Sequence, residues 1–122
     1  FNVNDVHPHD VATILDAGGV TFGDNVLVGP QCGFYTSGHP LDAAKRAQGL
    51  EYAYPIRVGS GVWIGARSTV LRDTVIADGS VVAACACVIG DVPADTLVAG
   101  VPARVMKEFG DRATETDQEP GR

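Results

Sequence analysis

Apolar side chains recur at every sixth position in two stretches of this chain. One six-residue grid is occupied by nine apolar residues: Phe22, Val28, Phe34, Val58, Ile64, Val70, Ile76, Val82 and Val88. Hydrophobic residues make up 45% of the sequence, so chance filling of all nine positions has a probability of about 1 in 1,000 for one register. The spacing therefore indicates a hexapeptide repeat.

Small residues occupy two further positions of each hexad. In most hexads the residue after the apolar position is Gly or Ala, which is typical of a short strand that turns without a bulky Cβ: Gly23, Gly29, Gly59, Gly65, Ala77 and Ala83. Leu71 and Ile89 are the exceptions, and we expect wider turns after them. The fourth residue after each apolar position is also small: Val26, Cys32, Val62, Ser68, Thr74, Ser80, Ala86 and Val92.

A period of six fits neither an α-helix nor an alternating strand. It is typical of a parallel β-helix, in which each hexad forms one flat face, three hexads complete a coil, and the apolar residues stack along the axis as the core. A solenoid of this kind suits a chain of 122 residues, because each coil only has to cover its neighbour. We predict one all-β domain over residues 1–110.

The repeat divides the chain into segments. Residues 1–19 are expected to be irregular, 20–34 form the first hexads, 35–57 interrupt the repeat, 58–92 resume it and 93–110 close the solenoid. A rigid β-helix that extrudes a long loop usually does so to build a site, so the chemistry is sought in residues 35–57. A Gly100-Val101-Pro102 turn leads into a predicted short helix that caps the coil stack. Residues 111–122 form an acidic tail, which we expect to be disordered.

Charge and targeting signals limit the partners. The formal net charge is −6 at pH 7, which argues against nucleic acid and anionic membrane as main partners. No signal peptide or transmembrane run is visible, so a cytoplasmic location is expected. The chain begins with Phe1 and not with Met, and we expect part of the N-terminal region to precede it.

The three cysteines are Cys32, Cys85 and Cys87. Their number and spacing suit neither a zinc site nor a disulfide framework. We expect buried, reduced thiols and not a catalytic cysteine, because no His lies near them in sequence and Ser and Ala occupy similar places in neighbouring repeats. No metal site is predicted.

Several segments resemble the hexapeptide-repeat acyltransferase family, and within it the maltose and galactoside O-acetyltransferase group. The hexads alone are shared by many left-handed β-helix proteins, whereas the HPLD loop and the Gly-Val-Pro-Ala-Arg end are together specific. The similarity runs from about Thr13 to Glu108 and is carried by Ile14-Leu15-Asp16, Phe22-Gly23-Asp24-Asn25-Val26, YTSGHPLD, GLEYAYPI, Val62-Trp63-Ile64-Gly65 and AGVPARV.

The resemblance implies a left-handed parallel β-helix of hexapeptide repeats, with an extruded loop and a short C-terminal helix. It also implies an acetyl-CoA-dependent O-acetyltransferase that acts on a hydroxyl of a sugar or related polyol. Members of the family are trimers with each site built between two subunits. A homotrimer agrees with the physical argument, because one narrow coil stack encloses a loop residue poorly unless a neighbour covers it.

His39 is the predicted catalytic residue. The resemblance assigns the histidine of this motif the role of a general base that removes a proton from the acceptor hydroxyl. An imidazole of ordinary pKa, about 6.5, is neutral near pH 7 and can accept that proton. Gly38 and Pro40 are expected to fix the backbone that aims the ring. The alternative is a loop histidine that only bonds a neighbouring carbonyl.

Three residues are candidates for binding the acceptor. Asp16 either orients acceptor hydroxyls or the imidazole, or it caps a turn before Gly18. Glu51 either lines the acceptor pocket or is a solvated charge, with Tyr52 and Tyr54 beside it as rings that pack on a sugar or a neighbouring subunit. His9 falls where the resemblance places an acceptor-contacting asparagine, whereas both His7 and His9 read locally as exposed loop residues.

The resemblance also implies a groove for acetyl-CoA along the coils. Ala66 and Ala84 match positions whose backbones meet the pantetheine arm, and Trp63 is expected to pack nearby or to be a buried structural indole. Arg104 and Lys107 are expected to face the phosphates from the terminal helix. Ile89 and Gly90 stand where the family often has a Thr-Lys pair, so one phosphate contact is lost unless Arg67 or Arg72 replaces it.

Two alternatives to a sugar acetyltransferase remain. One is a serine or xenobiotic acetyltransferase of the same fold, which the HPLD and GLEYAYP segments disfavour. The other is a non-catalytic β-helix that acts as a binding or scaffold protein, which His39 in its motif disfavours.

Overall fold

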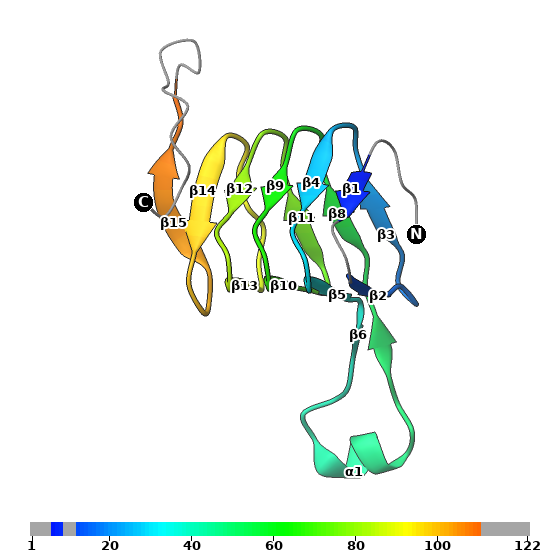
Figure 1. Cartoon of the computed structure of the whole chain (residues 1–122). Coiled ribbons are helices and arrows are strands. Elements are labelled where there is room, and N and C mark those ends of the chain that lie inside the picture. The colour runs from blue at the N-terminus through cyan, green and yellow to red at the C-terminus, as the bar shows by residue number, and fades with distance from the viewer. Residues whose placement is uncertain (1–5, 9–11, 111–122) are drawn as a thin grey trace.

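The structure is a computed structural model of the chain, and it describes residues 6–8 and 12–110. His9 and the acidic tail 111–122 lie outside the described residues. The chain winds into a left-handed parallel β-helix, as expected, with three sheets as the sides of a prism and one long loop that projects from it (Figure 1).

Successive coils contribute parallel strands to the three sheets, and β15 is added to one of them at the C-terminal end. The six-stranded sheet contains β1 (Val6–Pro8), β4 (Val26–Val28), β9 (Trp63–Ile64), β12 (Val81–Val82), β14 (Thr96–Ala99) and β15 (Arg104–Glu108). The four-stranded sheet contains β2 (Thr13–Leu15), β5 (Gly33–Tyr35), β10 (Thr69–Leu71) and β13 (Cys87–Val88). The three-stranded sheet contains β3 (Val20–Phe22), β8 (Ile56–Val58) and β11 (Thr74–Ile76).

The core confirms the six-residue grid. All nine grid residues are at most 4% exposed, and the eight small residues at the fourth position are buried beside them. Phe22 and Phe34 meet edge to face with ring centroids 5.3 Å apart. Trp63 pairs with Val81, 18 positions later, so three hexads complete one coil. Each buried residue therefore lies between equivalent residues of the coils before and after it.

The glycines after the core residues serve close packing between coils. A Cβ on Gly29 would lie 2.6 Å from the backbone N of Ala66, and one on Gly65 would lie 2.6 Å from the N of Ala84. The left-handed backbone that turns the corner lies two positions further on, in Asn25, Gln31, Gly61, Arg67, Asp73, Gly79 and Cys85. Glycine is thus required at these two positions because a Cβ would strike the next coil.

The N-terminal segment corrects the expectation of irregular structure over residues 1–19. β1 pairs with β4 and β2 with β5, so these strands belong to the first coil. Ile14 pairs with Phe34, 20 positions later, which is two more than the regular repeat. The extra residues lie in the turn Asp16–Gly19, where the amide of Gly19 donates to the carbonyl of Asp16 at 2.8 Å.

The turns after Leu71 and Ile89 are not wider, contrary to expectation. Leu71 continues β10 and pairs with Tyr35, and the next core residue, Ile76, still follows Val70 by one hexad. Beyond Ile89 the coil is shorter, because Val92 bridges to Ile76 after only 16 positions. Half-buried Leu71 extends the strand, and exposed Ile89 projects outward, so neither side chain opens its turn.

The predicted C-terminal helix is wrong. The chain reverses at Gly100, which has a φ of 98°, and residues Arg104–Glu108 form β15 antiparallel to β14. The last coil presents a strand edge with unpaired backbone groups, and an added strand satisfies them whereas a helix would not. Half-buried Ala103 packs against the core at this end, so the segment still closes the stack.

Candidate active site

The loop leaves and re-enters the prism through a short antiparallel ladder (Figure 1). β6 (Ser37–Gly38) pairs with β7 (Tyr52–Ala53), and a short helix, α1 (Ala43–Ala47), lies between them. Gly38 pairs with Tyr52. His39 and Glu51 are the next residues on the two arms, so the ladder brings these two predicted site residues to the same level of the loop.

The His39 side chain is exposed, and its backbone is held on both sides. Gly38 before it is fixed by the ladder, and Pro40 after it is buried. The Arg46 guanidinium donates from Nη1 to the carbonyl oxygens of Pro40 at 3.1 Å and Leu41 at 3.0 Å. Among the described residues, none forms a hydrogen bond with the imidazole. The ring is therefore presented on an ordered backbone with its nitrogens available.

Asp42 has a structural role in the HPLD segment. Its carboxylate accepts a hydrogen bond from the amide of Lys45 at 3.1 Å and caps α1. An Asp at this position satisfies one of the free amides in the first turn of the helix. The motif thus combines a buried proline, a helix cap and an exposed histidine within four residues.

Thr36 ties the turn that carries Asp16 to the base of the loop. The fully buried Thr36 hydroxyl donates to the carbonyl of Leu15 at 2.8 Å and accepts from the amide of Gly18 at 2.9 Å. The amide of Tyr54, on the returning arm, donates to the Thr36 carbonyl at 3.0 Å. Both loop arms and the Asp16 turn therefore form one hydrogen-bonded unit.

The register places three residues in a row at this corner of the prism. Leu15, Tyr35 and Leu71 are paired neighbours at the ends of β2, β5 and β10, so the residues that follow them, Asp16, Thr36 and Arg72, lie on successive coils. Neighbouring strands are about 4.8 Å apart. Asp16 and Arg72 therefore flank the coil from which the His39 loop emerges, one on each side.

Two tyrosines on the returning arm lie near the same neck. The rings of Tyr52 and Tyr54 have centroids 6.3 Å apart and are 41% and 45% exposed. The Tyr54 backbone packs so closely on Gly18 that a Cβ there would lie 2.7 Å from it. Glu51 is exposed beside Tyr52. His39 and Glu51 thus lie on the two arms of the loop and Asp16 lies at its base, and His9 lies outside the described residues.

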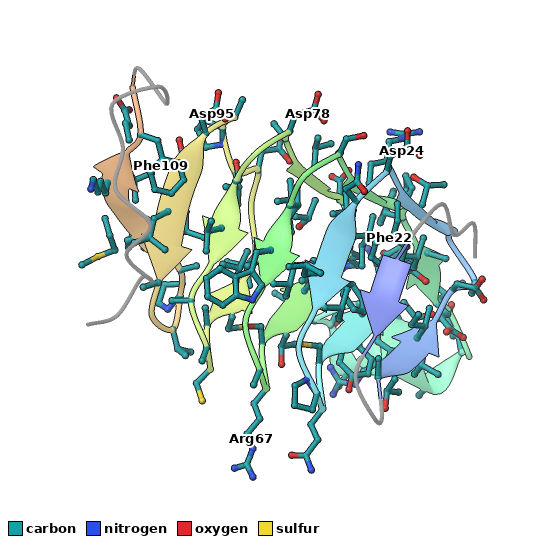
Figure 2. All side chains as sticks on the ribbon, turned by 45° about the horizontal axis from the view of Figure 1, so that its top comes forward. Phe22, Asp24, Arg67, Asp78, Asp95 and Phe109 are labelled. Carbon is teal, nitrogen blue, oxygen red and sulfur yellow. The ribbon has the colours of Figure 1, made fainter. Side chains whose placement is uncertain are left out.

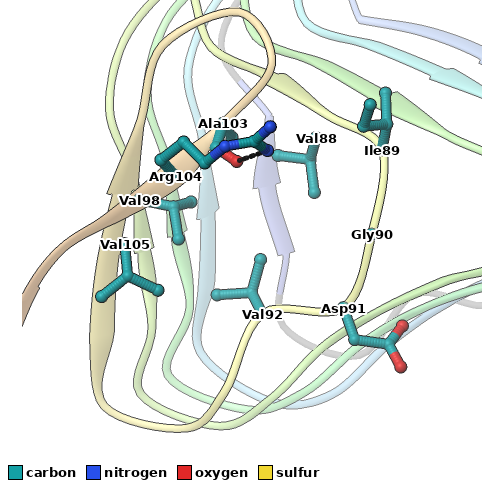
Figure 3. A pocket seen from close by; sticks show the side chains of 9 residues that line it. All are labelled: Val88, Ile89, Gly90, Asp91, Val92, Val98, Ala103, Arg104 and Val105. Atoms are coloured by element: carbon teal, nitrogen blue, oxygen red, sulfur yellow. Dashed lines mark hydrogen bonds between the residues drawn. The ribbon is translucent and has the colours of Figure 1, made fainter.

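The residues predicted to bind the cofactor divide between two regions. Ile89, Gly90 and Arg104 line a pocket of about 320 Å³ at the C-terminal end of the stack, between the last coil and β15 (Figure 3). Its inner wall is apolar, and Asp91 and Arg104 are the charged residues at its lining. The Arg104 guanidinium donates to the carbonyl of its neighbour Ala103 at 3.3 Å.

The other four predicted cofactor residues lie on the outside of the prism. Ala66 and Ala84 follow Gly65 and Ala83 at the corner between the six-stranded and four-stranded sheets, one coil apart. Half-buried Trp63 lies on the outer face of the six-stranded sheet, in a column formed through the pairs Leu27–Trp63, Trp63–Val81, Val81–Leu97 and Leu97–Lys107.

Arg104 and Lys107 share one side of β15 even though the segment is a strand. Arg104 pairs with Ala99 and Lys107 with Leu97, and the register shifts between Leu97 and Val98. Directly opposed residues of two strands point to the same face of the sheet. In a regular strand, residues three apart point to opposite faces, but the extra residue of a bulge returns Arg104 and Lys107 to the same face. By this register both residues belong to the side of β15 that pairs with Ala99 and Leu97, and Arg104 also lines the pocket at the end of the stack.

Charge differs between the corners of the prism. Asp24, Asp78 and Asp95 lie along one edge, and Arg67 projects from the opposite edge (Figure 2). Asp78 accepts a hydrogen bond from the amide of Ser60 at 2.8 Å, and the Ser60 hydroxyl accepts from the amide of Asp24 at 3.0 Å. The acidic edge is unsuited to a polyanion, whereas the edge with Arg67 adjoins Ala66 and Ala84.

The cysteines only partly follow the expectation. Cys32 is buried, and its thiol donates to the carbonyl of Gly65 at 3.1 Å. Cys87 is half-buried and Cys85 is exposed, so the prediction of three buried thiols is wrong for Cys85. Cys85 has a φ of 65° and stands at a corner, where the side chain points away from the core.

Sequence reasoning missed Thr36 and Arg46, and it named Arg72 only as a possible replacement for a phosphate contact. Thr36 and Arg46 act through contacts that depend on how the loop folds back. Arg72 reaches the loop from the following coil, where its guanidinium lies against Gly38. The only sequence signal for Thr36 is its place within YTSGHPLD, and none marks the other two.

Two negative findings concern the described part of the chain. Residues 6–8 and 12–110 contain no group of three or more His, Cys, Asp or Glu side chains placed to hold a metal ion. In the same residues, no helix has the length and apolar character needed to cross a membrane.

Comparison with known proteins agrees with this fold. Residues 55–91 match the family described as bacterial transferase hexapeptide (six repeats). A hexapeptide-repeat containing acetyltransferase from Vibrio cholerae has a crystal structure with a TM-score of 0.86 and 38% identity, covering 88% of this chain and 61% of that one. A structure of that protein complexed with acetyl coenzyme A gives 0.68 and 29%, covering 88% and 73%.

The relatives found by sequence are also acetyltransferases. The chain is 41% identical over 100 residues to the galactoside O-acetyltransferase of Escherichia coli, which covers 82% of this chain and 49% of that protein. It is 53% identical over 95 residues to the sophorolipid acetyltransferase of Starmerella bombicola, covering 78% and 37%. The chain belongs to the hexapeptide-repeat acyltransferase family. Its similarity within that family is to the galactoside and maltose O-acetyltransferases, and it spans about half the length of the curated relatives it matches.

Proposed function

We propose that the protein transfers an acetyl group from acetyl-CoA to a hydroxyl of a sugar or related polyol, with His39 as the general base. The observation that carries the proposal is the exposed His39 imidazole, held on an ordered backbone and without a hydrogen bond to any other described residue. A histidine that only stabilised the loop would use its ring nitrogens on a neighbouring group. Asp16 and Glu51 near the same neck supply carboxylates that orient the imidazole or the acceptor hydroxyls.

The reaction follows from this arrangement in one ternary complex. A ring nitrogen of His39 accepts the proton of the acceptor hydroxyl while the hydroxyl oxygen attacks the thioester carbonyl carbon. A C–O bond forms and the C–S bond breaks, and the departing sulfur of coenzyme A takes the proton from the imidazolium. The products are an acetyl ester and the free thiol. No covalent acyl-enzyme is needed, because proximity of the bound reactants supplies much of the rate.

Acetyl-CoA as the donor is supported by the relative solved in complex with it. The corner with Ala66, Ala84 and Arg67 has small side chains beside an exposed cation, which suits a pantetheine arm and phosphates. The cations Arg104 and Lys107 stand at the end of the stack, with Ile89 and Gly90 nearby. We assign both groups of residues, at the Arg67 corner and at the end of the stack, to the binding of acetyl-CoA, together with Trp63.

A homotrimer is part of the proposal. The outer column Leu27, Trp63, Val81 and Leu97 is a flat apolar strip, in which Leu27 is 46% exposed, and Leu41 at the tip of the loop is 97% exposed. Apolar strips of this kind mark subunit contacts. A neighbouring copy would cover the strip and enclose His39.

The test is release of free thiol from acetyl-CoA with a panel of sugars, serine and chloramphenicol. The proposal expects turnover with at least one sugar, loss of that turnover in His39→Ala, and a solution mass of three chains. Turnover confined to serine or chloramphenicol would favour the other enzyme activity of this fold. Tight acetyl-CoA binding without transfer to any acceptor would favour a binding or scaffold role.

A further inference from the structure

Arg72 lies directly against the backbone of the His39 loop. A Cβ built on Gly38 would be 2.6 Å from Cζ of Arg72 and 2.7 Å from its Nε. These atoms belong to the guanidinium group, so the cation lies against Gly38, and a side chain at that position would require the flexible end of Arg72 to move. Because Gly38 precedes His39, the contact brings a positive charge to the arm of the loop that carries the imidazole.

The guanidinium is directed toward the loop and away from the C-terminal coil. Val70 pairs with Val88, so the residue on the next coil that corresponds to Arg72 is Gly90. A Cβ on Gly90 would meet nothing within 4 Å, which shows that Arg72 does not lie over it. Arg72 is therefore poorly placed to replace the phosphate contact that Ile89 and Gly90 lack.

The charge of Arg72 is not neutralised within the described part of the chain. No carboxylate of residues 6–8 or 12–110 forms an ion pair with it, and its side chain is exposed. The acids placed around it are Asp73, beside it in sequence, Asp16, two coils away at the same corner, and Glu51, which precedes the Gly38 partner Tyr52 on the returning arm of the loop. By contrast, the Arg46 guanidinium is engaged by two carbonyl oxygens within the loop.

We propose that Arg72 is a specificity-determining residue that binds an anionic group of the acceptor, a carboxylate or a phosphate. A guanidinium presents paired N–H donors that match the oxygens of either anion. The acceptor would lie at the neck of the loop, with its hydroxyl at His39, polar groups toward Asp16 and its anion on Arg72. This inference rests on the proposed function and narrows its substrate class to acidic or phosphorylated sugars.

The test measures binding, so that it does not depend on turnover. Glucose, glucuronate and glucose 6-phosphate are titrated by calorimetry into the full chain with coenzyme A present. We expect at least one anion to bind more tightly than glucose. Arg72→Gln should raise its dissociation constant about tenfold or more, as expected for loss of charge-assisted hydrogen bonds, while the constant for glucose changes less than twofold. Arg72→Lys should recover part of the loss.

Arg57→Gln is the matched control, because Arg57 is an exposed arginine in the middle of β8 on another face of the prism. It should leave all three dissociation constants unchanged. The inference is overturned if the wild type binds neither anion more tightly than glucose, or if Arg57→Gln and Arg72→Gln weaken anion binding equally. Failure to transfer acetyl to any acceptor would refute the proposed function. The anion site would still be identified if the wild type binds an anionic sugar more tightly than glucose and Arg72→Gln loses that preference.

Discussion

The hydroxyl of Thr36 and the amide of Gly18 are joined by a hydrogen bond of 2.9 Å across two coils of the β-helix. The same hydroxyl donates to the carbonyl of Leu15 at 2.8 Å. One buried side chain therefore satisfies two backbone groups of the turn that carries Asp16, while its own residue begins the arm that carries His39. The turn that carries Asp16 and the loop that carries His39 are coupled through this threonine.

Thr36→Val should disturb that coupling without changing the volume of the side chain. Losing both bonds leaves the half-buried amide of Gly18 without this partner, whereas the carbonyl of Leu15 keeps its bond from the backbone amide of Thr36 at 3.1 Å. We expect the free energy of unfolding to fall by about 1–3 kcal/mol. The Michaelis constant for the acceptor should rise, while that for acetyl-CoA should change little. Denaturant unfolding and steady-state kinetics measure the two effects.

Thr96→Val is the control for Thr36→Val. Thr96 is equally buried, but its hydroxyl donates only to Ala94, two residues before it. It should lower stability by about 1 kcal/mol and leave the acceptor constant unchanged. If Thr96→Val raises the Michaelis constant for the acceptor as much as Thr36→Val does, Thr36 acts only through the general stability of the fold.

Gly65→Ala should destabilise the coil stack. The new Cβ would lie 2.6 Å from the amide nitrogen of Ala84, a backbone atom that cannot move without its coil. Overpacking of this kind costs about 1–3 kcal/mol. Gly90→Ala is the matched change, because its Cβ would meet nothing within 4 Å and its φ is not positive. If Gly65→Ala and Gly90→Ala have the same melting temperature, the coils do not approach as closely at Gly65 and Ala84 as the structure shows.

The two cysteines Cys85 and Cys32 should differ in reactivity toward an aromatic disulfide reagent. Cys85 is exposed and should react in the folded protein. Cys32 should react only on unfolding, because burial raises the pKa of its thiol and reduces the thiolate that reacts, although backbone hydrogen bonds from Ser68 and Arg67 oppose the rise. Mass spectrometry of the labelled peptides shows which cysteine reacts first.

The raised pKa of Cys32 also sets a pH dependence. The folded state favours the neutral thiol, so its contribution to stability is fully present below the ordinary thiol pKa of about 8.5 and is lost as the pH rises through the folded value. Denaturant unfolding at pH 7 and pH 10 should show a larger decrease for the wild type than for Cys32→Ala. Rapid labelling of Cys32 at neutral pH would contradict its burial.

Arg104→Ala combined with Lys107→Ala should weaken acetyl-CoA binding. Both cations belong to the same side of β15, and loss of charge-assisted contacts at about 1.5–3 kcal/mol each implies at least a tenfold increase in the Michaelis constant for acetyl-CoA. The effect should shrink at high salt, and the acceptor constant should change little. If calorimetry shows that the double variant binds coenzyme A as the wild type does, Arg104 and Lys107 do not bind the phosphates, and Arg67 is the next candidate.

The regular part of the fold could be predicted because one physical requirement repeats in it. Every core position from Phe22 to Val88 faces the same axis, so its apolar character appears in the sequence with a fixed period. The first coil was missed because the Asp16–Gly19 turn adds two residues and moves Ile14 off the grid. The terminal strand was missed because the edge of β14 that it satisfies is visible only once the coils are stacked.

The site could be predicted only where a local motif marks it. His39 is identifiable from its neighbours in sequence, whereas the contact of Arg72 with Gly38 joins residues 34 positions apart and follows from how the loop folds back. The two cations on β15 illustrate a third case. Arg104 and Lys107 were expected to share a face of a helix, and they share a face of a strand because the register shifts between Leu97 and Val98.

The most direct test of the account is the turnover number of His39→Ala with the best sugar acceptor from the panel. A general base in an exposed loop contributes to the transition state and little to the core, so turnover should fall by about 100- to 10,000-fold. The variant should keep the melting temperature and oligomeric mass of the wild type. A loss of less than tenfold in a protein that is otherwise unchanged would contradict the assignment of His39 as the base.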